Sequence, residues 1–191
     1  MKRILIICDA KDRAAWLKSS LESTGFDIVG TLAWEQADEQ SIQAASADVI
    51  VADAYASGRG TPEQISLIPA KLEVPVVVLD AQNDPRSIRE AMRAGISAYV
   101  AHAVHDEDLS AIIQVASARF AEHKRLHDEL NKVKNQLAER KLLDRAKGIL
   151  MADHGYSEAD AYKRMRGMAM GKNKRLSEIA EAIILAKELS V

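Results

Sequence analysis

The basic residues of this 191-residue chain are concentrated in one block, residues 140–175. The block holds ten lysines and arginines against four acids, a net charge of +6, whereas the whole chain carries −2. Its cationic members are Arg140, Lys141, Arg145, Lys147, Lys163, Arg164, Arg166, Lys172, Lys174 and Arg175. Cations gathered in this way in an otherwise acidic protein indicate a polyanionic partner such as a nucleic acid, the alternative being a solvated helix face.

A second set of residues could take part in phosphoryl chemistry. Asp9, Asp53, Asp80 and His102 each stand at the end of a short apolar run that has the length of a buried strand. If those strands are parallel, their carboxyl ends meet at one edge of a sheet, where α/β proteins place functional groups. Phosphoryl transfer to a carboxylate at such an edge requires cations that neutralise the negative charge.

The sequence shows no arrangement that is typical of an enzyme. It lacks a glycine-rich phosphate loop, a Ser-His-Asp grouping and a CxxC pair, and its five histidines do not have metal-ligand spacing. Cys8, the single cysteine, closes an apolar run and is expected to be a core thiol. We therefore expect no catalytic residue, no resident metal and no cofactor.

Strands that alternate with helices must position the acidic residues. The expected strands are residues 4–8, 27–31, 48–53, 75–80 and 98–102, and the expected helices are residues 13–24, 34–45, 62–72 and 85–94. This alternation predicts an α/β fold with a doubly wound, five-stranded parallel sheet.

A long helix is expected to begin near Glu107, because neither proline nor glycine occurs from there to Gly148. Four apolar side chains on it recur with the 4-3-4 spacing of a coiled coil. They are Leu126, Leu130, Val133 and Leu137. We expect this seam to join two copies of the chain. Beyond residue 138 the apolar stripe moves to another side of the helix, which predicts a small local bundle there.

Two further helices are expected to complete the bundle. His154 and Gly155 have the pattern of a helix end, and Ser157 with Asp160 resembles a capping box. The helix that follows, residues 158–170, is expected to bury Tyr162, which leaves Tyr156 or arginine planes to stack on the bases of a nucleic acid. The face of the first bundle helix that stays free carries Arg140, Lys141, Arg145 and Lys147.

Composition limits the setting of the protein. Hydrophobic residues make up 48% of the chain, which is ordinary for a globular protein, and one cysteine excludes an internal disulfide framework. No apolar stretch has the length of a membrane span, and the run at residues 4–8 is too short for a signal-peptide core. We expect a cytoplasmic protein that does not bind membranes.

The C-terminal third resembles a known RNA-binding module. The segment ERKLLDRAKGILMADHGYSEADAYKRMRGMAM, followed by RLSEIAEAII, is similar to the ANTAR domain, a three-helix module of transcription antiterminators. The matching positions are Ala146, Lys147, Leu150, Met151, Ala161, Tyr162, Ala169 and Ala180. The resemblance implies dimeric binding to a leader RNA with two adjacent stem-loops that have hexanucleotide loops. Binding would prevent a terminator hairpin from forming.

The first part of the chain resembles a two-component receiver domain, with Asp53 in the phosphoacceptor position. Receivers carry two acids after the first strand to hold Mg²⁺, but here Cys8 precedes Asp9, so one acid is missing. Asp80 replaces the usual hydroxyl residue and His102 replaces the usual lysine. The missing acid weakens a Mg²⁺ site at Asp9 and Asp53, and like charges this close repel a phosphoryl group. The alternative is that Asp80 helps to hold a cation. We expect a pseudo-receiver that binds a protein, with phosphorylation of Asp53 as the alternative.

The order receiver, coiled coil, ANTAR resembles the nitrate-regulatory NasT kind of response regulator. We divide the chain into a receiver-like domain (1–120), a coiled-coil linker (121–138) and an ANTAR domain (139–191). The leading hypothesis is an antiterminator of nitrate or nitrite assimilation genes, controlled by a nitrate-sensing partner protein. The alternatives are a DNA-binding and a protein-interaction response regulator. The apolar, acidic-to-neutral last helix, SEIAEAIILAKELS, disfavours major-groove reading.

Overall fold

The computed structural model describes residues 1–54, 73–81, 84–101 and 104–189. They form two compact units: unit 1 is Met1–Lys124 and unit 2 is Arg125–Val191. The helix predicted over residues 62–72 and the predicted site residue His102 lie outside the described residues.

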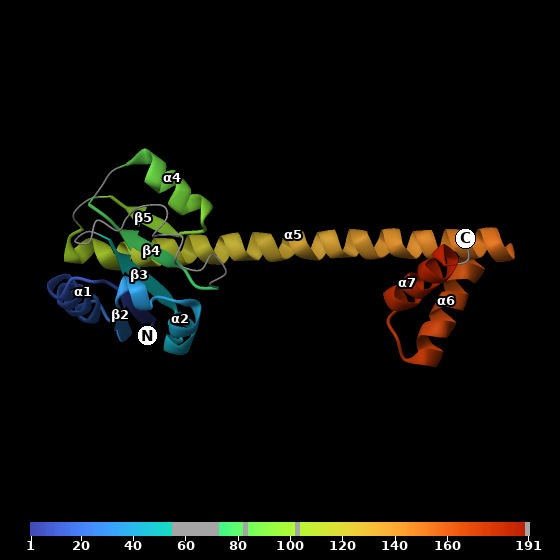
Figure 1. Ribbon diagram of the computed structural model, residues 1–191, viewed down its shortest axis with the longest axis horizontal. Coiled ribbons are helices and arrows are strands. Elements are labelled where there is room, and N and C mark those ends of the chain that lie inside the picture. Colours follow the sequence, from blue (N-terminus) through green and yellow to red (C-terminus); the bar gives the residue numbers. More distant parts are fainter. Residues whose placement is uncertain (55–72, 82–83, 102–103, 190–191) are drawn as a thin grey trace. The chain divides into compact units, whose positions relative to one another are not determined.

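Unit 1 is built on a parallel sheet with the strand order β2-β1-β3-β4-β5 (Figure 1). The strands are β1 (Arg3–Ile7), β2 (Asp27–Leu32), β3 (Val49–Asp53), β4 (Val76–Leu79) and β5 (Ala98–Val100). Every residue of the central strands β3 and β4 is buried, because helices cover both faces of the sheet. The predicted α/β fold with a doubly wound parallel sheet is confirmed.

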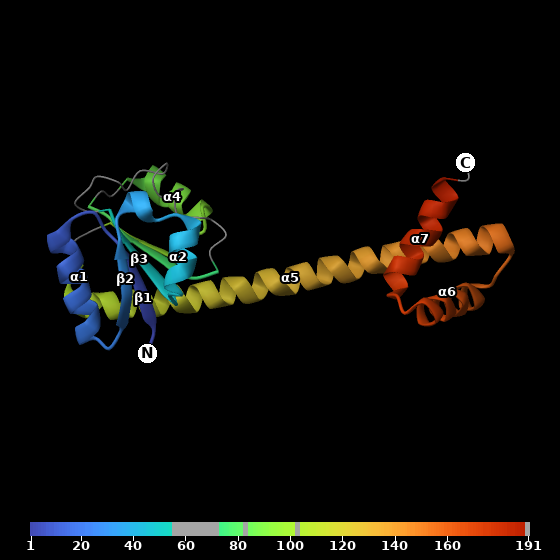
Figure 2. The ribbon, with the colours of Figure 1, turned by 60° about the horizontal axis from the view of Figure 1, so that its bottom comes forward.

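Alternate side chains of each strand point to opposite faces of the sheet and feed two separate cores. Helix α1 (Lys11–Ser23) and the first turns of α5 (Asp106–His154) pack on the face that contains Ile4 and Ile6. Helices α2 (Glu39–Ala45) and α4 (Pro85–Arg93) pack on the face that contains Leu5 and Ile7 (Figure 2). The two cores fix the sheet edge at which Asp9, Asp53 and Asp80 are placed.

One expected helix, residues 34–45, is two elements in the structure. A 3-10 turn, η1 (Trp34–Gln36), precedes α2, and Asp38 lies between them. The Asp38 carboxylate accepts a hydrogen bond from the backbone N–H of Ser41 at 2.7 Å. A carboxylate in this position caps a new helix rather than continuing an old one. The break lets Trp34 turn inward, where it is buried.

Helix α5 runs without interruption from Asp106 to His154 and contributes to both units. It ends where the sequence predicts, because Gly155 takes the left-handed conformation at φ 68° and its N–H donates to the Met151 carbonyl. None of the helices in the described parts of the chain combines the length and apolarity that a membrane crossing requires.

Unit 2 is a three-helix bundle. Helices α6 (Glu158–Lys172) and α7 (Leu176–Glu188) pack on the C-terminal part of α5 around a small core (Figure 2). Its fully buried members include Ala146 of α5, Met165 of α6 and Ala180 of α7. Ser157 caps α6, as predicted: its hydroxyl accepts from the N–H of Asp160 at 3.2 Å and donates to that residue's carboxylate at 2.6 Å.

Candidate nucleic-acid interface and carboxylate site

Asp53, at the end of β3, is paired with a cation from α1. The Arg13 Nε donates to the Asp53 Oδ2 at 2.8 Å, and the Asp53 side chain is fully buried. The Arg13 guanidinium also lies over the Trp16 ring, 4.7 Å from its centroid, which helps to hold it in place. A phosphoryl group or a metal ion that approached this carboxylate would have to compete with Arg13.

Sequence reasoning missed Arg13 and assigned the only positive charge at this edge to His102. The missed signal was positional. Helix α1 begins directly after β1, so its first turn lies at the same edge of the sheet as Asp9, and Arg13 is in that turn. The Asp9 carboxylate accepts from the backbone N–H of Trp34 at 2.9 Å, and the Trp34 indole N–H donates to the Asp53 carbonyl at 3.0 Å.

Asp80, at the end of β4, is buried and is hydrogen-bonded by the Tyr99 hydroxyl of β5. Burial, followed by the hydrogen bond to Asp80, raises the pKa of Tyr99 well above its usual value of 10.0. The three predicted carboxylates therefore lie at one sheet edge, and each has a donor from a neighbouring element. Asp53 and Asp80 are buried, whereas Asp9 is exposed.

Cys8 is buried at the end of the first apolar run, as expected of a core thiol. Burial, and then the nearby negative charge of Asp53, raise its pKa above the usual 9.0. A thiol with a raised pKa is a poor nucleophile. In the part of the chain that the structure describes, no group of three or more His, Cys, Asp and Glu side chains is arranged to hold a metal ion.

The cationic block of unit 2 is spread over three places. Arg140, Lys141 and Arg145 are exposed on α5, and Lys163, Arg164 and Arg166 are exposed on α6. Lys172, Lys174 and Arg175 are exposed at the turn between α6 and α7. Arg145 is paired with Glu188 of α7 at 2.8 Å, but 62% of its side chain remains exposed. Nine of the ten cations thus face solvent.

Lys147 is the exception, and the interpretation that it is freely solvent-facing is wrong. Only 16% of its side chain is exposed, and its ammonium lies 2.7 Å from both Asp144 of α5 and Glu158 of α6. These hydrogen bonds raise the pKa of Lys147 above 10.5, and the bond from Lys147 holds the pKa of Asp144 below 3.8. Lys147 lies at the edge of the face of α5 that the bundle covers. From there its ammonium reaches Glu158, so it links α5 to α6.

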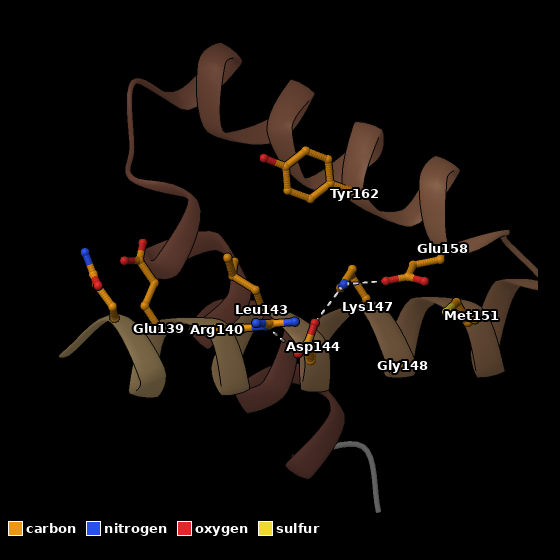
Figure 3. Close-up of a pocket in the computed structure, with 10 residues that line it drawn as sticks. Glu139, Arg140, Leu143, Asp144, Lys147, Gly148, Met151, Glu158 and Tyr162 are labelled. Atoms are coloured by element: carbon orange, nitrogen blue, oxygen red, sulfur yellow. Dashed lines mark hydrogen bonds and ion pairs between the residues drawn. The ribbon is translucent and has the colours of Figure 1, made fainter. Parts of the chain in front are cut away.

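A groove of about 680 Å³ lies between α5 and α6 (Figure 3). Its lining residues are Gln136, Glu139, Arg140, Leu143, Asp144, Lys147, Gly148, Met151, Glu158 and Tyr162. The prediction that Tyr162 belongs to the core is wrong, since Tyr162 is 44% exposed in this groove. Helical spacing places it one position beyond Ala161, which is buried, so its ring lies at the border of the core rather than inside it.

The four residues of the predicted seam form an exposed stripe on α5. Leu126, Leu130, Val133 and Leu137 are 51%, 50%, 60% and 53% exposed. Large apolar side chains that repeat on one helical face at this exposure are typical of a surface that another helix covers. Helix α5 has no such stripe after Leu137, where its apolar side chains join the core of unit 2.

Comparison with known proteins identifies a family model and two relatives that are similar to this chain. The ANTAR domain model matches residues 131–184. The transcriptional regulatory protein PdtaR of Mycobacterium tuberculosis is 30% identical over 183 residues, 96% of this chain and 89% of that protein. The nitrate regulatory protein of Klebsiella oxytoca is 43% identical over 68 residues, 36% of this chain and 17% of that protein.

A solved structure supports the fold of unit 1. The signal receiver domain of a modulated diguanylate cyclase from Desulfovibrio desulfuricans superposes with a TM-score of 0.54 at 23% identity. The match covers 64% of this chain and 98% of the receiver domain. Unit 1 therefore has the receiver fold.

Proposed function

Because the chain belongs to the ANTAR-domain response regulators, we propose that it is an RNA-binding transcription antiterminator. Unit 2 binds a leader RNA that carries two adjacent stem-loops, and the bound protein prevents a terminator hairpin from forming. The two relatives described above are regulatory proteins, which favours a regulator over an enzyme.

The distribution of exposed charge is the observation that carries the proposal. Unit 2 has fourteen lysines and arginines against ten acids, a net charge of +4, whereas unit 1 has twelve against eighteen, a net charge of −6. Exposed cations attract the phosphates of RNA and release counterions, which makes binding strong at low salt. The acidic unit 1 repels the same backbone, which favours contact through unit 2.

A homodimer fits an RNA with two stem-loops. The exposed seam, Leu126 to Leu137, supports pairing with a second copy through the segment 121–138, which we assign as a coiled-coil linker. Two such chains would present two ANTAR units to the two loops, and tethered binding at both loops raises the affinity above that of either one. The seam spans about two heptads, which is short for a coiled coil, so RNA stabilises the dimer.

Unit 1 acts in this proposal as a protein-binding control domain. Arg13 already neutralises Asp53, and Asp80 is held by Tyr99, so the carboxylate edge is disfavoured as a site for Mg²⁺ and a phosphoryl group. A sensor protein that binds the free regulator would then compete with dimerisation or with RNA. The likeness to the nitrate regulatory protein favours nitrate or nitrite as the signal, through its match to 68 residues.

The test is a binding comparison between RNA and DNA. Full-length protein is titrated into a pool of synthetic two-stem-loop RNAs with randomised six-nucleotide loops, and into duplex DNAs of the same sequences. We expect gel shifts that enrich particular loop sequences among the RNAs, with much weaker and unselective shifts for duplex DNA. Equal binding of both, or selection among the DNAs alone, would favour a DNA-binding regulator. Binding of neither would favour a protein-interaction regulator.

A further inference from the structure

We propose that the groove between α5 and α6 is a base-binding subsite, in which the ring of Tyr162 stacks on an unpaired nucleotide of the bound RNA. The inference rests on the proposed RNA-binding function and deepens it, because it separates the residue that receives a base from the cations that hold phosphates.

Tyr162 has the exposure and the surroundings of a stacking residue. It lies on the α6 side of the groove, and Leu143, Arg140 and Lys147 lie on the α5 side (Figure 3). The groove volume of about 680 Å³ is in the range of small-ligand sites. Tyr162 is 44% exposed in this groove, so a flat ligand can reach its side chain. Unpaired RNA bases are recognised by aromatic rings of this kind.

The charges of the groove suit a base rather than a phosphate. Three acids line it, Glu139, Asp144 and Glu158, against the two cations Arg140 and Lys147. Lys147 is already paired with Asp144 and Glu158, and Arg140 lies 4.0 Å from Asp144. A phosphate would meet an excess of carboxylates here. A neutral base presents both donors and acceptors at its edge, and both carboxylates and cations can pair with them.

Gly148 leaves open space on the α5 wall of the groove, as the helical glycines Gly167 and Gly171 do on α6. A glycine inside a helix destabilises it relative to alanine, so a packing reason is normally expected. At Gly148 no such reason is present, because an added Cβ would meet no atom within 4 Å. The missing side chain keeps the α5 wall of the groove flat, next to the space that Tyr162 faces.

Exposed cations lie beside the groove, where the phosphates on either side of a stacked base would pass. Lys141 follows Arg140 on α5, and Arg166 lies one turn beyond Tyr162 on α6. The division predicts two kinds of variant. Loss of a flanking cation changes the salt dependence of binding, whereas loss of the ring changes base stacking and leaves the salt dependence as it was.

The first test removes the ring. The tightest-binding RNA from the randomised two-stem-loop pool is prepared with each loop purine replaced in turn by 2-aminopurine, whose fluorescence falls on stacking. With full-length protein we expect quenching at one loop position. Tyr162→Phe should retain it, whereas Tyr162→Leu should abolish it and weaken binding roughly tenfold to a hundredfold. Tyr156→Leu is the matched control, since Tyr156 is 36% exposed in the same unit but does not line this groove.

The second test fills the groove without loosening the fold. Gly148→Gln replaces a glycine in mid-helix with a better helix former in open space, so we expect the thermal midpoint to stay or rise while quenching is lost. Gly171→Gln, near the end of α6, is the matched control, because an added Cβ there also meets open space. It should keep both the quenching and the affinity.

The outcomes of these tests distinguish failure of the base-binding subsite from failure of the proposed RNA-binding function. RNA binding that Tyr162→Leu and Gly148→Gln leave intact, or quenching that disappears in Tyr156→Leu instead, overturns the subsite and leaves the antiterminator proposal standing. A change of sedimentation in Tyr162→Leu, with quenching unaltered, overturns it in favour of a contact between chains. Failure of every RNA in the pool to bind the unaltered protein rejects both proposals.

Discussion

At the scale of single residues, charges in this protein do two different things that look the same in the sequence. Some are solvent-facing and available to a polyanion, such as Lys141, which is exposed on α5. Others are used inside the fold, such as Arg13 at Asp53 and Lys147 between Asp144 and Glu158. Only the neighbours in space distinguish the two kinds, and some of these neighbours lie far away in the sequence, such as Asp53 of β3 for Arg13 and Glu158 of α6 for Lys147.

Lys141 should behave as a phosphate contact. We expect Lys141→Ala to weaken binding of the two-stem-loop RNA and to lower the slope of log affinity against log salt by about 0.7, the value for one single-stranded phosphate contact. The measurement is a salt titration of affinity. Lys187→Ala is the control, since Lys187 is paired with Asp153 at 2.7 Å and is not part of the cationic block. Equal slopes for all three proteins would remove Lys141 from the interface.

Lys147 should stabilise the fold, and its contribution to stability should depend on pH. The pKa of Asp144 is lowered in the fold, so its contribution to stability is fully present above the ordinary value of 3.8 and is lost as pH falls through the folded pKa. We expect Lys147→Met to reduce the hydrogen-exchange protection of α6 amides at neutral pH. The decrease in stability that the unaltered protein shows in acid should be absent in this variant. Lys141→Met should follow the unaltered protein. Parallel pH curves for Lys147→Met and the unaltered protein would contradict the assignment.

Asp53 should be dispensable for the signal response. Arg13 occupies its carboxylate, so we expect acetyl phosphate with Mg²⁺ to give little stable aspartyl phosphate, and Asp53→Asn to retain antitermination and its regulation. The measurement is acid-labile phosphate per chain by intact mass. Stoichiometric phosphate on Asp53, together with lost regulation in Asp53→Asn, would restore a conventional phospho-switch.

At the scale of elements, the apolar patterns were the most informative part of the sequence. Short apolar runs predicted the strands β1, β3, β4 and β5, and the change of stripe on α5 predicted the transition from seam to bundle. Tyr162 was misplaced because helical periodicity gives the direction of a side chain but not the width of the face that a neighbour covers. The expected helix over residues 34–45 was divided by Asp38, whose capping bond depends on the backbone around it.

The seam on α5 should control assembly. We expect Leu130→Glu with Leu137→Glu to give a folded monomer that binds a two-stem-loop RNA much more weakly but keeps its affinity for one stem-loop, because only the tethering is lost. Analytical ultracentrifugation measures the state of assembly. Asn131→Glu with Asn135→Glu adds the same charges to exposed positions outside the seam and should leave the dimer intact. A dimer that survives the leucine changes would place the seam elsewhere.

At the scale of the whole molecule, charge is divided between two units, with a net charge of −6 on unit 1 and +4 on unit 2. The sequence predicted this division, the receiver fold and the ANTAR resemblance, since each depends on residues close together in the chain. The carboxylate edge was only partly predictable. Asp9, Asp53 and Asp80 could be placed there from the strand ends, and Arg13 could have been placed there from its position in the first turn after β1. The hydrogen bond from Tyr99 to Asp80 joins two strands, and no local pattern signals it.

If binding of this protein to a leader RNA prevents termination, single-round transcription will show it. The template carries the selected two-stem-loop sequence so that its second stem overlaps an intrinsic terminator, and the RNA polymerase is purified. Added protein should raise the fraction of read-through transcripts, and the Leu130→Glu and Leu137→Glu double variant should not. Unchanged read-through at protein concentrations that saturate the RNA would contradict the proposed antitermination.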